Sequence, residues 1–297
     1  MEIRKVLVVD FPSQLGEIPQ PPEFLWMRGS LPPQGTKFLA VVGSRALTSY
    51  GRQACESLIE GLAGYPISIV SGLALGADAC AHRAALRAGL HTIAIPGSGL
   101  GDDVIGPKTN AELAKEILRA GGALLSEHPP DYIAHPYDFP SRNRIMVGLS
   151  HAVLIIEAGS RSGTLITAGM AGDYNRELLC VPHRIGDTHG FGSHLFLRLG
   201  AAHISESAHI LEALGIPPSD TLAEDTYLKL SESEQKLFDL LEDPRPRDDI
   251  IRESLMPAHE VLSLLGILEM KGVLKEEFGL WKRVMQREAS MLPLDHI

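Results

Sequence analysis

Six short apolar runs, alternating with segments long enough to form helices, constrain the fold of this chain more than any other feature. Within each run, polar and apolar residues do not alternate, which is the pattern of parallel strands buried on both faces of a sheet. The repeated order of strand and helix predicts an α/β fold with a doubly wound parallel sheet over residues 37–215. Right-handed crossovers then place the loops after the strands along one edge, where such sheets bind ligands. The runs are 38–42, 67–70, 91–95, 123–126, 152–156 and 178–181, and the helical segments between them include 51–63, 77–88 and 110–120.

The segments on either side of this pattern differ from it in composition. Residues 1–36 contain six prolines, too many for a long regular element, and we expect an N-terminal extension that wraps the next domain. Residues 216–227 are polar and are expected to be a linker. Residues 228–284 predict a small C-terminal winged-helix domain, and residues 285–297 form a tail with no clear pattern.

The winged-helix prediction rests on three short helical segments followed by a hairpin. Ser231 and Glu234 have the spacing of a capping box at the start of the first helix. Residues 247–253 and 258–271 supply the next two helices, and residues 272–283 alternate like a hairpin around Gly279. The helix at 258–271 has one basic residue and two glutamates, which suits a phosphate groove poorly. A protein-contact or regulatory role is therefore favoured for this domain.

The composition of the 297-residue chain supports a buried core and limits its partners. No apolar run approaches the ~20 residues of a membrane helix, so no membrane partner is expected. Cys55, Cys80 and Cys180 are scattered and odd in number, which disfavours a disulfide scaffold or a cysteine zinc site and favours the reducing cytoplasm. The net charge of −10 is not that of a nonspecific DNA binder, so a nucleic acid would need a local cationic groove.

Loops that contain glycine follow four of the predicted strands, at 43–45, 71–78, 96–99 and 157–164. Glycines let backbone N–H groups approach a ligand closely, and each following helix points its positive end at the same edge. Together these loops predict a concavity that binds phosphates. The sequence has neither GxGxxG after the first strand nor GxxxxGK[ST], which disfavours a dinucleotide or P-loop nucleotide site.

Three arginines supply positive charge near this predicted edge. Arg45 ends the first strand, and Arg142 and Arg144 lie at a helix start. Guanidinium groups oppose the helix dipole there unless an anion neutralises them, so a bound phosphate is one interpretation. The alternative is that an arginine pairs with Glu127 or Glu157 and braces the sheet.

Histidines and carboxylates give no metal or cofactor motif. Asp78 and His82 lie four residues apart on one helical face, but a third ligand is missing, so a capping role is favoured for Asp78 at the helix start. We therefore predict no metal and no cofactor.

The combination of these motifs resembles the DNA-processing protein A family (DprA, also called Smf). The resemblance runs from about Leu39 to Ile204, more than half of the chain. The motifs are Val42-Gly-Ser-Arg45, Ser71-Gly-Leu-Ala74 with Asp78 and His82, Ser126-Glu127, Phe139-Pro-Ser-Arg-Asn-Arg144, Glu157-Ala158 and Ser162-Gly-Thr164.

The resemblance implies an extended Rossmann-like domain that binds single-stranded DNA, protects incoming DNA and promotes loading of the RecA recombinase in natural transformation and homologous recombination. It also implies a homodimer and a noncatalytic protein. Because only 5% of the residues are aromatic, binding is expected to be mainly electrostatic. The predicted DNA-binding residues are Gly43, Ser44, Arg45, Ser71, Gly72, Arg142, Asn143, Arg144, Ser162, Gly163 and Thr164.

The sequence departs from the family pattern at three places. His183 follows Val181 and Pro182 where the family usually has glycine, and His194 stands where the family usually has asparagine. A basic residue often found just before Phe139 is not evident. These departures leave open how the corresponding loops engage DNA.

An enzymatic alternative is a nucleotide phosphoribohydrolase of the LOG type, which shares this sheet architecture, or a nucleotide-sensing protein. Those hydrolases place a carboxylate directly after a glycine-threonine loop. Here Gly163 and Thr164 are followed by Leu165, Ile166 and Thr167, none of which ionises. The general acid/base step therefore has no candidate at that position.

Overall fold

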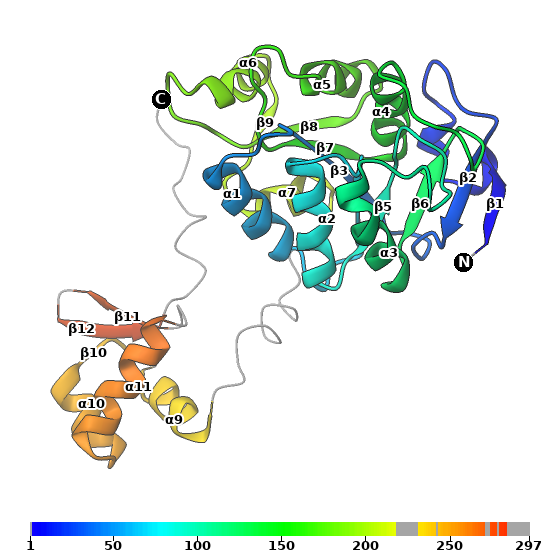
Figure 1. The fold of residues 1–297 in the computed structure, drawn as a ribbon. Helices are drawn as coiled ribbons and strands as arrows, with labels where there is room; N and C mark the ends of the chain where they lie inside the picture. Colours follow the sequence, from blue (N-terminus) through cyan, green and yellow to red (C-terminus); the bar gives the residue numbers. More distant parts are fainter. Residues whose placement is uncertain (1, 218–230, 242, 271–273, 278, 284–297) are drawn as a thin grey trace. The chain divides into compact units, whose positions relative to one another are not determined.

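The computed structural model describes residues 2–217, 231–241, 243–270, 274–277 and 279–283, and these form two compact units, Met1–Pro218 and Ser219–Ile297 (Figure 1). The remaining parts of the expected linker, hairpin and tail lie outside the described residues, as does Lys271.

A nine-stranded sheet in the order β1-β2-β6-β5-β4-β3-β7-β8-β9 forms the centre of the first unit. Its parallel strands confirm the predicted α/β fold, because each of the six apolar runs forms one of them. They are β3 (Lys37–Val42), β4 (Ile67–Ser71), β5 (His91–Ala94), β6 (Ala123–Ser126), β7 (Ala152–Ile155) and β8 (Glu177–Cys180). The chain moves outward from β3 to β6 and then returns to β7 on the other side of β3. The switch point, where such sheets bind ligands, therefore lies between the loops after β3 and β7.

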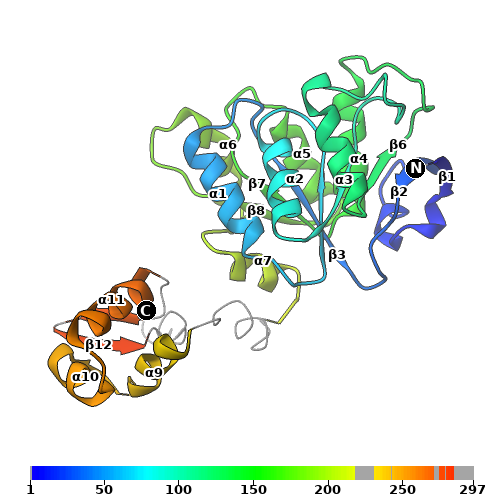
Figure 2. The same ribbon diagram turned by 60° about the horizontal axis from the view of Figure 1, so that its bottom comes forward.

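Helices cover both faces of this sheet (Figures 1 and 2). Alternate residues of β3 separate the two cores: Leu39 and Val41 pack on one side, and Phe38, Ala40 and Val42 pack on the other. One face carries α1 (Ser49–Glu60), α2 (Ala77–Arg87), α3 (Ala111–Arg119) and α7 (Ser207–Ala213). The other carries α4 (Asp138–Leu149), α5 (Thr164–Asp173) and α6 (Phe191–Arg198).

The proline-rich N-terminal segment contributes two strands that the sequence analysis did not foresee. β1 (Ile3–Leu7) pairs antiparallel with β2 (Phe24–Gly29), and β2 pairs antiparallel with β6. Neither strand contains proline, because the prolines lie in the connections, where no ladder hydrogen bond is lost. At the opposite edge, the short β9 (Ala202–His203) extends the sheet beyond β8.

The second unit has the predicted winged-helix elements. α9 (Glu232–Leu240) begins with the expected capping box, in which the Ser231 N–H donates to the Glu234 carboxylate at 2.8 Å and the Glu234 N–H donates to Ser231 Oγ at 3.3 Å. β10 (Arg245–Pro246) and the hairpin β11 (Leu274–Glu277) and β12 (Leu280–Arg283) form a three-stranded sheet beside α10 (Arg247–Ser254) and α11 (Ala258–Met270). Leucines from these helices pack around the buried Trp281.

Candidate functional site

The loop after β3 packs tightly against the start of α2 and presents Arg45 to solvent. A Cβ atom on Gly43 would lie only 2.7 Å from the Ala77 Cβ, and the Ser44 carbonyl accepts from the Ala77 N–H at 3.0 Å. Gly76, just before α2, has φ = +75°, and a side chain there would overlap the Ser44 carbonyl. These contacts fix the loop, so Arg45 extends from a rigid backbone.

Arg45 is the most accessible of the three predicted arginines. Its guanidinium lies 5.3 Å from the centre of the Phe139 ring, a distance typical of a cation–π contact. Among the described residues it forms no ion pair. Its charge is therefore available to an external anion at the switch point.

Arg142 is buried and satisfied inside the protein. Its Nη1 donates to the Gly72 carbonyl at 2.7 Å, and its Nε donates to Asn143 Oδ1 at 2.8 Å. Its Nη2 lies 3.8 Å from the Asp78 carboxylate. Burial lowers the pKa of Arg142 to about 10, because the charged form loses hydration, while Asp78 opposes that shift. The guanidinium thus braces the loop after β4 from within.

The Asp78 side chain holds the same loop by accepting from its backbone N–H groups. The N-cap position of α2 is Gly76, so the expected capping role is wrong in detail. One Asp78 carboxylate oxygen instead accepts from the N–H groups of Gly72 at 3.1 Å and Ala74 at 3.2 Å. Burial raises the pKa of Asp78, and Arg142 and these hydrogen bonds act against that rise. The Gly72 N–H and C=O are both occupied internally.

The buried pair explains why position 72 is glycine. A Cβ atom there would overlap the Arg142 guanidinium. The adjacent Ser71 also faces inward, since its hydroxyl donates to the Val41 carbonyl at 2.7 Å. The predicted residues of this loop therefore shape the site rather than line its surface.

The loop after β7 is the more open of the two loops at the switch point. The Thr164 N–H donates to Ser162 Oγ at 3.2 Å, and the Ser162 hydroxyl donates to Thr164 Oγ1 at 2.9 Å. Gly163 is exposed, with no atom within 4 Å of the place a Cβ would take. Asn143 links α4 to α5 by donating to Thr167 Oγ1 at 2.8 Å.

Arg144 forms the ion pair that the sequence analysis gave as the alternative to a bound phosphate. Its guanidinium contacts the Glu127 carboxylate after β6, and its Nη1 donates to the Gln20 carbonyl at 2.6 Å. The side chain thus ties α4 to the N-terminal segment.

Glu157 pairs with no arginine in the described part of the chain. Its fully buried carboxylate accepts from the N–H of Thr48 at 3.0 Å and from the hydroxyl of the same residue. A Cβ on Gly51 would overlap this carboxylate. The His183 ring, at the first departure from the family pattern, is buried with its Nε2 3.9 Å from Glu157.

Two further arginines on the same edge were not among the predicted site residues. Arg161 lies in the loop after β7 and Arg184 in the loop after β8, and both are exposed. Within the described residues neither forms an ion pair. Their positions in the loops that follow two of the predicted strands are the signal that could have revealed them.

His82 is a core residue rather than a ligand. Its Nδ1 lies 2.8 Å from Thr92 Oγ1, and burial lowers its pKa to about 3. In the described part of the chain, no group of three His, Cys, Asp or Glu side chains is placed to hold a metal ion.

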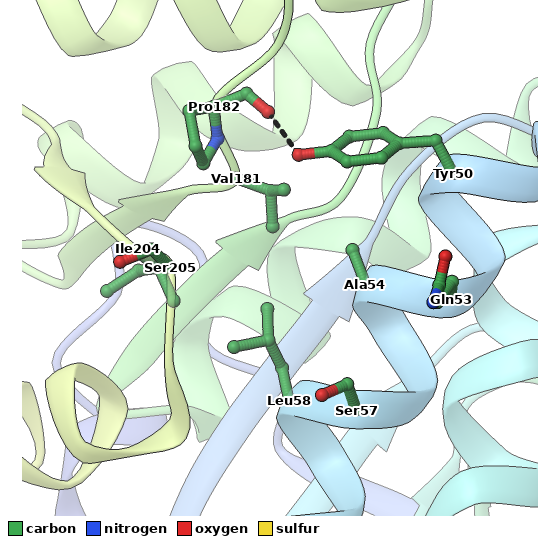
Figure 3. A pocket seen from close by; sticks show the side chains of 9 residues that line it. All are labelled: Tyr50, Gln53, Ala54, Ser57, Leu58, Val181, Pro182, Ile204 and Ser205. Carbon is green, nitrogen blue, oxygen red and sulfur yellow. Dashed lines mark hydrogen bonds between the residues drawn. The ribbon is translucent and has the colours of Figure 1, made fainter. Parts of the chain in front are cut away.

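A separate pocket of about 290 Å³ lies between α1 and the end of β8 (Figure 3). The Tyr50 hydroxyl, which donates to the Pro182 carbonyl at 2.7 Å, closes one side of it. None of its lining side chains is charged, and none is a predicted site residue. This pocket therefore lies apart from the predicted anion site, which is at the loops after β3 and β7.

Comparison with known proteins agrees with this architecture. The family model of DNA recombination-mediator protein A matches residues 5–215, and the DprA winged helix domain matches residues 217–279. The chain belongs to the DNA recombination-mediator protein A family. The family thus accounts for both units, and the enzymatic alternative is not favoured.

Relatives of this family align over most of the chain. Protein Smf of Escherichia coli is 36% identical over 270 residues, which cover 88% of this chain and 72% of that protein. DNA processing protein A from Streptococcus pneumoniae superposes with a TM-score of 0.66 at 36% identity, covering 71% of this chain and 74% of that one. DNA processing protein A from Helicobacter pylori, which has a single-stranded DNA binding mode, superposes with a TM-score of 0.62 at 28% identity. The superposition covers 76% of this chain and 97% of that one. No described helix has the length and apolar character needed to cross a bilayer.

Proposed function

We propose that the protein binds single-stranded DNA at the carboxyl edge of its sheet and acts without catalysis as a recombination mediator. The observation that carries this proposal is Arg45, an exposed cation on a rigid loop at the switch point that forms no ion pair with any residue the structure describes. The open loop at Gly163 lies across the switch point from it. The family relationship supports the choice of ligand.

The eleven predicted DNA-binding residues divide into three roles within this proposal. Arg45 and the Ser162–Thr164 loop contact phosphates, joined by Arg161 and Arg184. Arg142 and Arg144 act as positioning residues, because their guanidinium groups are held by Asp78 and Glu127. Gly43, Ser44, Ser71, Gly72 and Asn143 shape the loops through their internal contacts.

The proposal has four further parts. The protein protects incoming DNA and loads RecA in natural transformation, and it is a homodimer located in the cytoplasm. Family membership supports the first two. The dimer is supported by apolar side chains that α6 and its C-terminal end expose, namely Phe191, Leu195 and Leu199. Such a face gains free energy when a second copy covers it. Light scattering of the purified chain tests this part.

The nucleotide phosphoribohydrolase alternative lacks a carboxylate at the required place. The residues after Thr164 do not ionise, and the nearby Glu157 is fully buried and bonded to Thr48. Release of a free base from a nucleoside monophosphate would nevertheless contradict the noncatalytic assignment.

Binding of a labelled oligo-dT strand and of its duplex tests the main proposal. The wild-type protein should prefer the single strand, and Arg45→Ala should weaken binding at least tenfold, which is about 1.4 kcal/mol. Arg4→Ala is the matched control, because it removes the same charge from β1 at an edge of the sheet. Equal affinity for duplex, or an Arg45→Ala variant that binds like the control, contradicts the proposal.

A further inference from the structure

In the loop between β6 and α4, the rings of four side chains lie next to one another, an arrangement that was not predicted from the sequence. His128 and Tyr132 stack face to face, with ring centres 4.0 Å apart and planes 12° apart. His135 and Tyr137 lie nearly parallel, with centres 5.6 Å apart and planes at 6°. Tyr132 meets His135 edge-on at 6.0 Å. These four residues form a continuous set that we name the ring ladder.

The buried Asp138, at the start of α4, holds three of the four ring-ladder residues in place. Its carboxylate accepts from the His135 N–H at 2.7 Å and from the Tyr132 hydroxyl at 3.0 Å, and it lies 3.6 Å from His128 Nε2. A side-chain hydrogen bond with Tyr137 raises the pKa of Tyr132 above its usual value, and burial and Asp138 add to the rise. Ordering of the rings before any ligand arrives lowers the entropy cost of binding.

The outer end of the ring ladder faces solvent. His135 is exposed, and Tyr137 keeps 68% of its surface accessible. The segment from Glu127 to Ser141 contains no lysine or arginine but has Glu127, Asp131 and Asp138. Glu127 is paired with Arg144 and Asp138 is buried, so the segment has no cation of its own for a phosphate, and the chemistry that it offers a ligand is the face of an aromatic ring.

The ring ladder also lies beside the proposed phosphate contact. Phe139 follows Asp138 directly, and the Arg45 guanidinium lies over the Phe139 ring at 5.3 Å. The same ring packs on the loop after β5, where a Cβ on Gly97 would lie 2.9 Å from it. A strand whose phosphate meets Arg45 thus has its bases within reach of the neighbouring rings.

We propose that the ring ladder is a base-stacking site, in which the exposed faces of Tyr137 and His135 take an unpaired base of the single strand held by Arg45. Every base has a π-face, so this contact is tolerant of sequence, and duplex DNA is excluded because its bases are already stacked. The inference rests on the proposed function, and it adds a base contribution to binding that was expected to be mainly electrostatic.

The test compares two labelled ligands of equal length, an oligo-dT strand and an abasic sugar-phosphate chain, by fluorescence anisotropy. Tyr137→Ala should weaken binding of oligo-dT about fivefold or more, which is about 1 kcal/mol, and change binding of the abasic chain less than about twofold. Ile133→Ala is the matched control, because Ile133 lies in the same loop and is also 68% exposed but has no ring. It should change neither affinity.

Arg45→Ala separates the two proposals, because loss of a phosphate contact should weaken binding of both ligands. If Arg45→Ala does so while Tyr137→Ala leaves oligo-dT binding unchanged, or weakens both ligands equally, the stacking site is wrong and the DNA-binding function stands. If the wild-type protein binds neither ligand, both proposals are wrong. A melting temperature equal to that of wild type confirms that Tyr137→Ala folds.

Discussion

The Asp78→Asn substitution removes the negative charge that faces the buried Arg142 guanidinium while keeping an oxygen that can accept from the Gly72 and Ala74 N–H groups. Two unit charges 3.8 Å apart interact by about 4 kcal/mol at an effective dielectric constant of about 20. Breaking a buried pair on one side typically costs roughly 3–5 kcal/mol, since the remaining charge stays desolvated. We therefore expect the free energy of unfolding of the first unit to fall by about 4 kcal/mol. For a unit of this size, that lowers its melting temperature by roughly 8–16 °C.

Differential scanning calorimetry and urea unfolding measure this loss. Asp102→Asn is the matched control, because Asp102 pairs with Arg28 but its side chain is 59% exposed, and such surface pairs contribute about 1 kcal/mol or less. The double variant Asp78→Asn with Arg142→Met should recover much of the loss, since no unpaired buried charge remains. A single variant that loses less than about 1 kcal/mol, or a double variant whose loss equals the sum of the two single losses, would refute the role assigned to this pair.

The remaining predictions concern the packing and the pH dependence of the same region. Gly72→Ala should lower the free energy of unfolding by about 1–3 kcal/mol, because the added methyl group displaces the Arg142 guanidinium. Gly163→Ala places its methyl group in open space and should change the free energy of unfolding by about 0.5 kcal/mol or less. Equal effects of the two variants in urea unfolding would contradict the packing described around Gly72. The pKa of His82 is about 3 in the folded protein, against an ordinary value of 6.5. Between pH 6.5 and pH 3 the unfolded chain therefore binds a proton on His82 that the folded chain does not. The free energy of unfolding falls as the pH falls, by about 2 kcal/mol from pH 7 to pH 5. His82→Gln should reduce the fall in the free energy of unfolding between pH 7 and pH 5 by about 2 kcal/mol, as measured by urea unfolding at the two pH values. A fall as large as that of the wild-type protein would contradict this role of His82.

Sequence patterns determine the parallel sheet because its strands are buried on both faces and therefore consist almost entirely of apolar residues. The edge strands β1 and β2 lack this signature, since they are partly exposed and belong to a proline-rich segment. Local composition thus predicted the centre of the sheet and missed the strands at both of its edges, β1 and β2 on one side and the short β9 on the other.

The candidate site was predictable in place but not in detail. The glycine loops and Arg45 follow strands, so chain order alone places them at one edge. The inward course of Arg142 depends on Asp78 and Gly72, which are distant in sequence and meet it only in the folded chain. The ring ladder depends on the conformation of a loop, and the spacing of its four residues in the sequence does not predict that their rings are in contact.

The salt dependence of oligo-dT binding tests the central claim most directly, because it counts the phosphates that the protein neutralises. On single strands the logarithm of the binding constant falls with the logarithm of salt concentration by about 0.7 per neutralised phosphate. Three exposed arginines, Arg45, Arg161 and Arg184, predict a slope of about −2. Arg45→Ala should reduce its magnitude by about 0.7. A slope near zero, or a slope that Arg45→Ala leaves unchanged, would contradict the claim that the protein binds DNA phosphates at the carboxyl edge of the sheet.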